Sequence, residues 1–212
     1  MARKEIKKEK KGMNLPNKIT CCRLVISVIV LVMLVMPWDN VGIHFPVFPV
    51  YGVENVNIKY IIAGVLFMIG SVTDFLDGYI ARKYNMVTDF GKVMDAIADK
   101  MLVNGVLIIL AYDQFLPVIV PVIIITRDII VDSIKMASGS KGKVVAASWA
   151  GKIKTICMMI GVTLVFFYNM PFAFIVKGLH VDYFFVFVAV IMSIISGCQY
   201  YIVNKDFIFS EI

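Results

Sequence analysis

A chain of 212 residues that is 60% hydrophobic and only 17% charged differs from a soluble globular domain, in which about a quarter of the residues are charged. The net charge of +6 would suit a nucleic-acid-binding protein, but six of the 21 basic residues lie in the first eleven positions and most others at the ends of apolar runs. Composition and charge placement therefore argue against a soluble domain and a nucleic-acid partner, and they indicate a protein embedded in the lipid bilayer.

The apolar runs predict six membrane-spanning helices, each close to the roughly 20 residues needed to cross the hydrocarbon core of a bilayer. In chain order these spans cover about residues 19–36, 58–76, 93–112, 116–134, 153–168 and 183–203. The second span is expected to continue as a helix beyond residue 76, and segment 38–57, with its prolines and glycines, is expected to be a loop. The predicted fold class is an all-α integral membrane protein, with a basic N-terminal arm over 1–16 and one six-span domain over 17–212.

The distribution of lysine and arginine predicts the orientation in the membrane. Basic residues concentrate in the N-terminal arm, in the 82–92 turn and in the 135–154 connection, whereas the alternate loops contain only Lys177. Since basic loops remain on the cytoplasmic side, both termini are expected in the cytoplasm and the chain in the plasma membrane.

Four aspartates interrupt the apolar pattern around the end of the second span and the start of the third. Asp74 and Asp77 are three residues apart and Asp95 and Asp99 four apart, so each pair shares one helix face. The polar segment 83–90 is expected to turn the chain back, so that the two acidic faces meet at the cytoplasmic side. Clustered carboxylates near the membrane require protonation or a cation, and sites made only of oxygen ligands favour Mg²⁺ or Mn²⁺.

The spacing of these residues resembles the signature of the CDP-alcohol phosphotransferases. Asp74-x-x-Asp77-Gly78-x-x-Ala81-Arg82 is followed after eight residues by Gly91-x-x-x-Asp95-x-x-x-Asp99, which together contain all eight defining residues. The resemblance implies a membrane enzyme that transfers a phosphatidyl or similar group from a CDP-linked donor to an alcohol, with release of CMP. It also implies a homodimer.

The resemblance further implies roles for individual residues. The expected ligands of two Mg²⁺ or Mn²⁺ ions are Asp74, Asp77, Asp95 and Asp99. Asp99 is also the candidate general base for the acceptor hydroxyl. The residues expected at the CDP-linked donor are Asn17, Thr20, Asp77, Gly78, Ala81, Arg82 and Gly91, with Arg82 on the pyrophosphate. Close helix packing is the alternative role of the two glycines, and capping of the first helix is the alternative for Asn17 and Thr20.

A second group of charged residues bears on the acceptor. Arg127 falls within a predicted span and needs an anionic partner. A pocket of Arg127, Lys135 and Lys154, with Lys152, would suit a phosphorylated acceptor, although each residue alone could be an interfacial anchor. Segment 126–155 resembles the bacterial phosphatidylglycerophosphate synthases, a branch of the same family. That resemblance implies CDP-diacylglycerol as the donor and the sn-1 hydroxyl of glycerol 3-phosphate as the acceptor.

Two alternatives stay open at this point. Lys135, Met158 and Ala96 depart from residues common in that branch, so a sibling enzyme could use inositol phosphate, serine or phosphatidylglycerol as its acceptor. The second alternative is a cation transporter with aspartates along an ion path. That class predicts acidic residues spread through the membrane depth and often two repeated halves, whereas here the acidic residues cluster at one face and no repeat is visible.

Overall fold

The computed structural model describes residues 14–50, 53–84, 88–140, 148–175 and 179–209. In this part of the chain the long helices are α1 (Leu15–Val35), α2 (Ile58–Lys83), α3 (Asp89–Tyr112), α4 (Ile119–Ser140), α5 (Trp149–Phe166) and α7 (Val181–Phe209). The shorter elements are the 3-10 helix η1 (Trp38–Val41), the strands β1 (Val47–Val50) and β2 (Val53–Asn57), and the single turn α6 (Phe172–Ile175). Each predicted span corresponds to one long helix, with boundaries that differ by up to seven residues, the largest difference being at the end of α2, where the helix was expected to continue.

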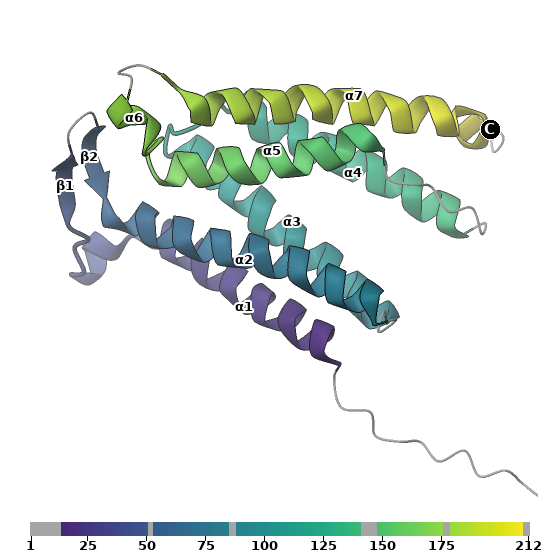
Figure 1. The fold of residues 1–212 in the computed structure, drawn as a ribbon, viewed down its shortest axis with the longest axis horizontal. Coiled ribbons are helices and arrows are strands. Elements are labelled where there is room, and N and C mark those ends of the chain that lie inside the picture. The colour runs from purple at the N-terminus through teal and green to yellow at the C-terminus, as the bar shows by residue number, and fades with distance from the viewer. Residues whose placement is uncertain (1–13, 51–52, 85–87, 141–147, 176–178, 210–212) are drawn as a thin grey trace, which may run out of the picture.

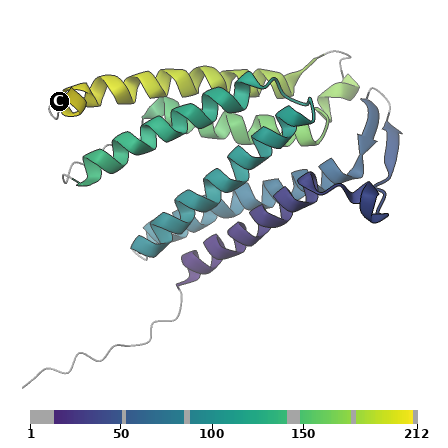
Figure 2. The same ribbon diagram turned by 180° about the vertical axis from the view of Figure 1, so that it is seen from behind.

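The long helices form two groups that lie one above the other in both views (Figures 1 and 2). In the first group α1 packs against α2 and α3, and in the second α7 packs against α4 and α5. Contacts of α2 with α5 and of α3 with α4 join the two groups. The apolar core between them contains fully buried side chains such as Phe67 of α2, Leu107 of α3 and Phe166 of α5.

Small residues allow some of these helices to approach closely. A Cβ atom added to Gly64 of α2 would lie 2.7 Å from Cβ of Phe166, and one added to Gly161 of α5 would lie 3.0 Å from the backbone nitrogen of Val186 in α7. Since neither neighbour is the far end of a flexible side chain, the glycines determine the separation of these helices.

Successive long helices run in opposite directions, so the ends of the helices lie at two opposite ends of the bundle (Figure 1). One end holds the starts of α1, α3 and α5 and the last turns of α2, α4 and α7; we call it the motif end, because the aspartates of the signature lie in its helices. The opposite end holds the β-hairpin and α6. There Tyr168 Oη accepts a hydrogen bond of 3.1 Å from the backbone nitrogen of Asn57, and Tyr60 Oη donates one of 2.7 Å to Asp113.

The prediction that 38–57 is an irregular loop is wrong. Within it, β1 and β2 pair as an antiparallel hairpin, with Val47 opposite Asn57 and Val50 opposite Val53. The valines and phenylalanine of this segment favour extended backbone, and Val56 is buried. Pro49 is tolerated because each strand of a two-stranded sheet is an edge strand, which leaves one side of its backbone free of ladder hydrogen bonds.

Four helices in the described part of the chain are long and apolar enough to cross a membrane, namely α1, α2 (to Ala81), α5 and α7 (to Asn204). Helices α3 and α4 are of similar length but carry more charged residues, including Asp95, Asp99, Arg127 and Asp128. Many large apolar side chains on the outer faces are exposed, as expected where lipid is the neighbour. The protein is therefore a multi-pass membrane protein.

Candidate active site

Helices α2 and α3 bring three of the four predicted aspartates together. One carboxylate oxygen each from Asp74, Asp77 and Asp95 lies within 4.8 Å of the others. Asp77 is only 3% exposed, whereas Asp74 and Asp95 are partly exposed. The structure therefore confirms that the two acidic faces meet, and we call these three residues the carboxylate triad.

The positive charge at the triad comes from Arg23 of α1, which the sequence analysis did not identify. Its side chain is fully buried and forms ion pairs with Asp74 and Asp95, and one guanidinium nitrogen lies 3.6 Å from Oδ2 of Asp77. The signal that could have found Arg23 is the one applied to Arg127: a charged residue inside an apolar run requires a partner of opposite charge. α1 thus contributes the counter-charge to an acidic site built by two other helices.

Two further polar side chains of α1 contact the motif helices. Thr20 Oγ1 donates a buried hydrogen bond of 2.9 Å to Oδ2 of Asp77. Asn17 and Thr88 exchange two hydrogen bonds. Asn17 Nδ2 donates to Thr88 Oγ1 at 3.0 Å, and Thr88 Oγ1 donates to Asn17 Oδ1 at 3.2 Å. Neither Asn17 nor Thr20 caps α1, because both lie inside the helix and its N-cap position is Asn14. The capping alternative for these two residues is therefore wrong.

Thr88, which the sequence analysis missed, is the N-cap of α3. Its Oγ1 accepts a hydrogen bond of 3.0 Å from the backbone nitrogen of Gly91. A Cβ atom added to Gly91 would lie 2.6 Å from Oδ1 of Asn17 and 3.0 Å from Thr88 Oγ1, so a larger residue would displace this contact. Close packing therefore accounts for Gly91, while its predicted contact with a donor stays a prediction.

The other predicted donor residues follow the triad along α2. Gly78 and Ala81 are partly buried on the face that also presents Asp74 and Asp77. The backbone of Arg82 continues the helix, and its side chain lies outside the part of the chain that the structure describes.

Asp99 lies one helical turn after Asp95 but outside the group of three oxygen donors that the described residues form. It lines a small cavity together with Asp128 of α4 and Lys154 of α5. Its carboxylate is largely removed from water and interacts with the cations Arg23 and Lys154 and with the carboxylates of Asp95 and Asp128. Asp99 is therefore the residue that connects the triad to the second charged group.

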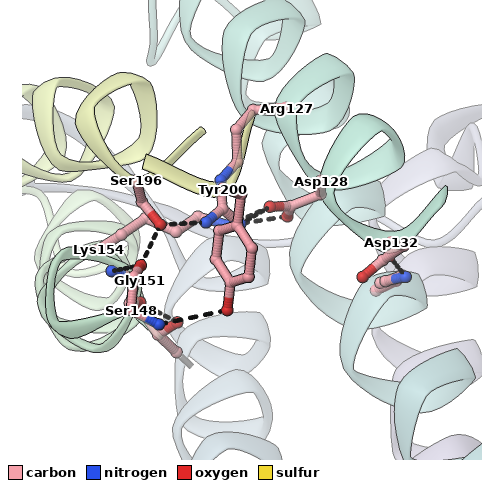
Figure 3. A network of polar contacts seen from close by, with 10 residues as sticks. Arg127, Asp128, Asp132, Ser148, Gly151, Lys154, Ser196 and Tyr200 are labelled. Atoms are coloured by element: carbon pink, nitrogen blue, oxygen red, sulfur yellow. Dashed lines mark hydrogen bonds and ion pairs between the residues drawn. The ribbon is translucent and has the colours of Figure 1, made fainter. Parts of the chain in front are cut away.

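That second group is a network of polar contacts among α4, α5 and α7 (Figure 3). Lys154 donates hydrogen bonds of 2.7 Å to both carboxylate oxygens of Asp128, and Arg127 donates one of 2.9 Å to Oδ1 of the same residue. Asp128 is thus the anionic partner that Arg127 was expected to need. Lys154 is buried, at 8% exposure, so this pairing compensates a charge that is largely removed from water.

Side chains of α5 and α7 complete the network. Ser148 is the N-cap of α5, where its hydroxyl accepts from the backbone nitrogen of Gly151 at 3.1 Å and contacts the hydroxyl of Ser196. Ser196 also accepts a hydrogen bond from Arg127, and Tyr200 Oη accepts one of 3.2 Å from the Ser148 nitrogen. The sequence analysis gave Ser196 and Tyr200 no role, since α7 carries no motif.

Four basic residues were predicted at the acceptor phosphate. Arg127, Lys135 and Lys154 are connected through Tyr200 and Asp128, whereas Lys152 is not part of these contacts in the described residues. Lys135 Nζ lies 5.3 Å from the ring centre of Tyr200, and the guanidinium carbon of Arg127 lies 5.8 Å from the same ring. With Lys154, they form what we call the basic network, in which Asp128 pairs with Arg127 and Lys154, and Lys135 joins through the Tyr200 ring. Lys152 is exposed on the first turn of α5. The network carries an excess of positive charge that suits an anionic ligand.

Two kinds of comparison, with family profiles and with individual known proteins, indicate the same family. The profile of the CDP-alcohol phosphatidyltransferase family matches residues 13–198. A Bacillus subtilis protein named CDP-diacylglycerol–glycerol-3-phosphate 3-phosphatidyltransferase is 36% identical over 193 residues, which is 91% of this chain and 96% of that protein. A Rickettsia felis protein of the same name is 30% identical over 195 residues, covering 92% and 97%. A Mycobacterium tuberculosis protein named probable phosphatidylglycerophosphate synthase is 34% identical over 151 residues, covering 71% and 69%.

The pairing of Asp128 gives a prediction about stability. Asp128→Asn leaves Lys154 and Arg127 without their carboxylate, and we expect it to lower the free energy of unfolding by about 3 kcal/mol. Lys154→Met added to that variant removes the unpaired buried charge, so the double variant should be more stable than Asp128→Asn alone. Unfolding by SDS titration in detergent micelles measures both effects. Ser133→Ala, an exposed change on the same helix, is the control, and a double variant no more stable than the single one would contradict the pairing.

Proposed function

The chain belongs to the CDP-alcohol phosphatidyltransferase family, and from this premise we propose that it transfers the phosphatidyl group of CDP-diacylglycerol to the sn-1 hydroxyl of glycerol 3-phosphate. The products are phosphatidylglycerophosphate and CMP. The names of the similar bacterial proteins support this activity. The observation that carries the proposal is the position of Asp99, which adjoins the carboxylate triad along α3 and the basic network across its cavity.

The triad fits a divalent cation. It offers three hard oxygen donors within 4.8 Å of one another, and when all three are ionised Arg23 balances only one of the three charges. We assign Asp74, Asp77 and Asp95 as ligands of Mg²⁺ or Mn²⁺. Such an ion stabilises the negative charge on the transferred phosphoryl group and on the leaving CMP. Asp99 lies outside this group, so the role we assign to it is proton transfer rather than metal binding.

The protein's own residues account for the remaining steps. Gly78 and Ala81 leave room for the donor beside α2, and Arg82 is assigned to its pyrophosphate. Arg127, Lys135 and Lys154 hold the phosphate of the acceptor, and Lys152, exposed on the first turn of α5, is assigned only a weak, longer-range attraction for it. The sn-1 oxygen bonds to the phosphatidyl phosphorus, the bond from that phosphorus to the CMP oxygen breaks, and the hydroxyl proton passes to Asp99. The homodimer implied by the family resemblance stays a prediction.

A direct assay tests the reaction. The purified protein in detergent should release CMP from CDP-diacylglycerol when both Mg²⁺ and glycerol 3-phosphate are present, and EDTA should stop the release. Asp99→Asn should reduce kcat at least about a hundredfold, which is the lower range for loss of a general base. The matched control is Asp39→Asn, an exposed aspartate of η1 at the opposite end of the bundle, which should keep wild-type activity.

Each other result of this assay has a definite meaning. CMP release only with inositol phosphate, serine or phosphatidylglycerol would contradict the acceptor assignment but not the reaction class. If no acceptor supports CMP release from folded protein, the reaction class is wrong, and cation flux into liposomes is the measurement for the transporter alternative.

The basic network predicts that two exposed lysines, Lys135 and Lys152, differ in their importance for binding the acceptor phosphate. Lys135 and Arg127 both lie against the Tyr200 ring, whereas Lys152 is exposed on the first turn of α5. We expect Lys135→Gln to raise KM for glycerol 3-phosphate about tenfold, as the loss of one charge-assisted hydrogen bond would. Lys152→Gln, the matched control, should raise it less than about threefold by the same measure. Equal KM values for both variants and the wild type would contradict this phosphate site.

We further propose that all six long helices cross the membrane and that the motif end faces the cytoplasm. Most basic residues of the described chain, including Lys83, Lys135 and Lys152, lie toward that end, whereas Lys59 lies at the start of α2 at the opposite end; this imbalance supports the orientation. Alkaline phosphatase fused after residue 209 should therefore be inactive in a bacterial host, and the same enzyme inserted after Val41 in η1 should be active. An active C-terminal fusion would exclude six spans with a cytoplasmic N-terminus.

A further inference from the structure

We propose that Arg23 and a divalent cation are alternative counter-ions of the carboxylate triad. The guanidinium holds α1 to α2 and α3 through the triad, and entry of the cation shifts it away from the carboxylates. The inference rests on the proposed function, because that function assigns the triad to a metal ion. It adds a residue of α1, outside the signature, as a positioning residue that controls metal affinity.

The geometry places Arg23 in direct competition for the triad. Its two terminal nitrogens face oxygens of all three carboxylates, from two other helices, and the same three carboxylates form the candidate cation site. A cation bound to the triad would lie next to a buried guanidinium, and like charges at such separations repel strongly when little water lies between them. The two positive charges draw on the same three carboxylates and repel each other, so we infer that binding of the cation weakens the contacts of the guanidinium.

The contacts of Arg23 are incomplete, which makes it displaceable. Nε of Arg23 is buried and has no hydrogen-bond partner among the described residues. Its 3.6 Å separation from Asp77 exceeds hydrogen-bond length, and the oxygen of Asp77 is bonded instead to Thr20. A planar guanidinium matches one carboxylate in a bidentate pair, not three from different directions. The full desolvation of this side chain is therefore only partly compensated by its partners.

Charge balance also favours exchange of the two counter-ions. Three ionised carboxylates and one guanidinium leave an excess of two negative charges at the triad. A divalent cation neutralises that excess more fully than the guanidinium does, whereas the guanidinium is part of the chain and needs no ion from solution. The competing explanation is that Arg23 only ties α1 to its neighbours; in that case its removal lowers stability equally with and without metal and does not tighten metal binding.

Mn²⁺ binding distinguishes these explanations without a measurement of activity. We would titrate Mn²⁺ into the purified protein, follow free Mn²⁺ by electron paramagnetic resonance, and record thermal unfolding in EDTA and in saturating Mn²⁺. We expect Arg23→Gln to lower Kd for Mn²⁺ about tenfold or more through the loss of the repulsion. Its unfolding temperature in EDTA should fall below that of the wild type, and Mn²⁺ should raise it by more than in the wild type. Arg23→Lys, which keeps the charge but not the planar fork, should lie between the two.

Two control variants separate the failure of this inference from the failure of the proposed function. Arg127→Gln removes a partly buried arginine of the basic network and should leave Kd for Mn²⁺ within about twofold of the wild type, because charges farther from the triad are screened more strongly. Asp74→Asn should weaken Mn²⁺ binding; if it does not, the metal assignment in the proposed function is wrong whatever Arg23 does. An unchanged or weaker affinity in Arg23→Gln overturns the inference alone. If Arg23→Gln folds only with Mn²⁺ present, that dependence supports the exchange, and Arg23→Lys supplies the affinity.

Discussion

The ion pairs between Arg23 and the carboxylate triad are the interaction on which the motif end of the bundle depends. Three carboxylates within 4.8 Å of one another repel, and partial burial of the group strengthens that repulsion. The guanidinium of α1 offsets this cost and at the same time fixes α1 against the two motif helices. Thr20 and Asn17 extend the same contact surface toward Asp77 and Thr88. The first helix is therefore part of the candidate active site, although it carries none of the eight residues of the signature.

The second group of helices, α4, α5 and α7, also has to pair charges that are removed from water, but here the excess charge is positive. There the buried charges are cations, and Asp128 pairs with both Lys154 and Arg127, so that neither is left unpaired in a region with little water. Ser148, Ser196 and Tyr200 then tie the start of α5 to α7. Away from the two charged groups, the core of the bundle is apolar, and glycines lie at its closest helix contacts. This packing holds the triad and the basic network at fixed positions.

The sequence predicted the long helices well, because apolar runs of about 20 residues have few other structures available in a bilayer. It also predicted the meeting of Asp74 and Asp77 with Asp95, since helical spacing and a short turn determine that geometry. It failed at the β-hairpin, where Pro49 concealed the strand pattern, and at Thr88, Ser196 and Tyr200. Those side chains act through contacts between residues 48 to 71 positions apart in the sequence, such as Asn17 with Thr88, which no local pattern encodes. Arg23 was within reach, because a charge inside an apolar run always needs a partner.

The proposed reaction explains why the two charged groups have opposite signs. Both substrates are anions, a pyrophosphate-linked lipid and a phosphorylated alcohol, so bringing them together without neutralisation is opposed by their mutual repulsion. Basic side chains neutralise the acceptor phosphate directly and leave its hydroxyl free. The same solution at the donor would place protonated side chains beside the leaving group, whereas carboxylates recruit cations that bind its oxygens from several sides. Asp99 lies between the two charged groups, one helical turn after Asp95 and in one cavity with Asp128 and Lys154, which is the position that proton transfer from the acceptor hydroxyl requires.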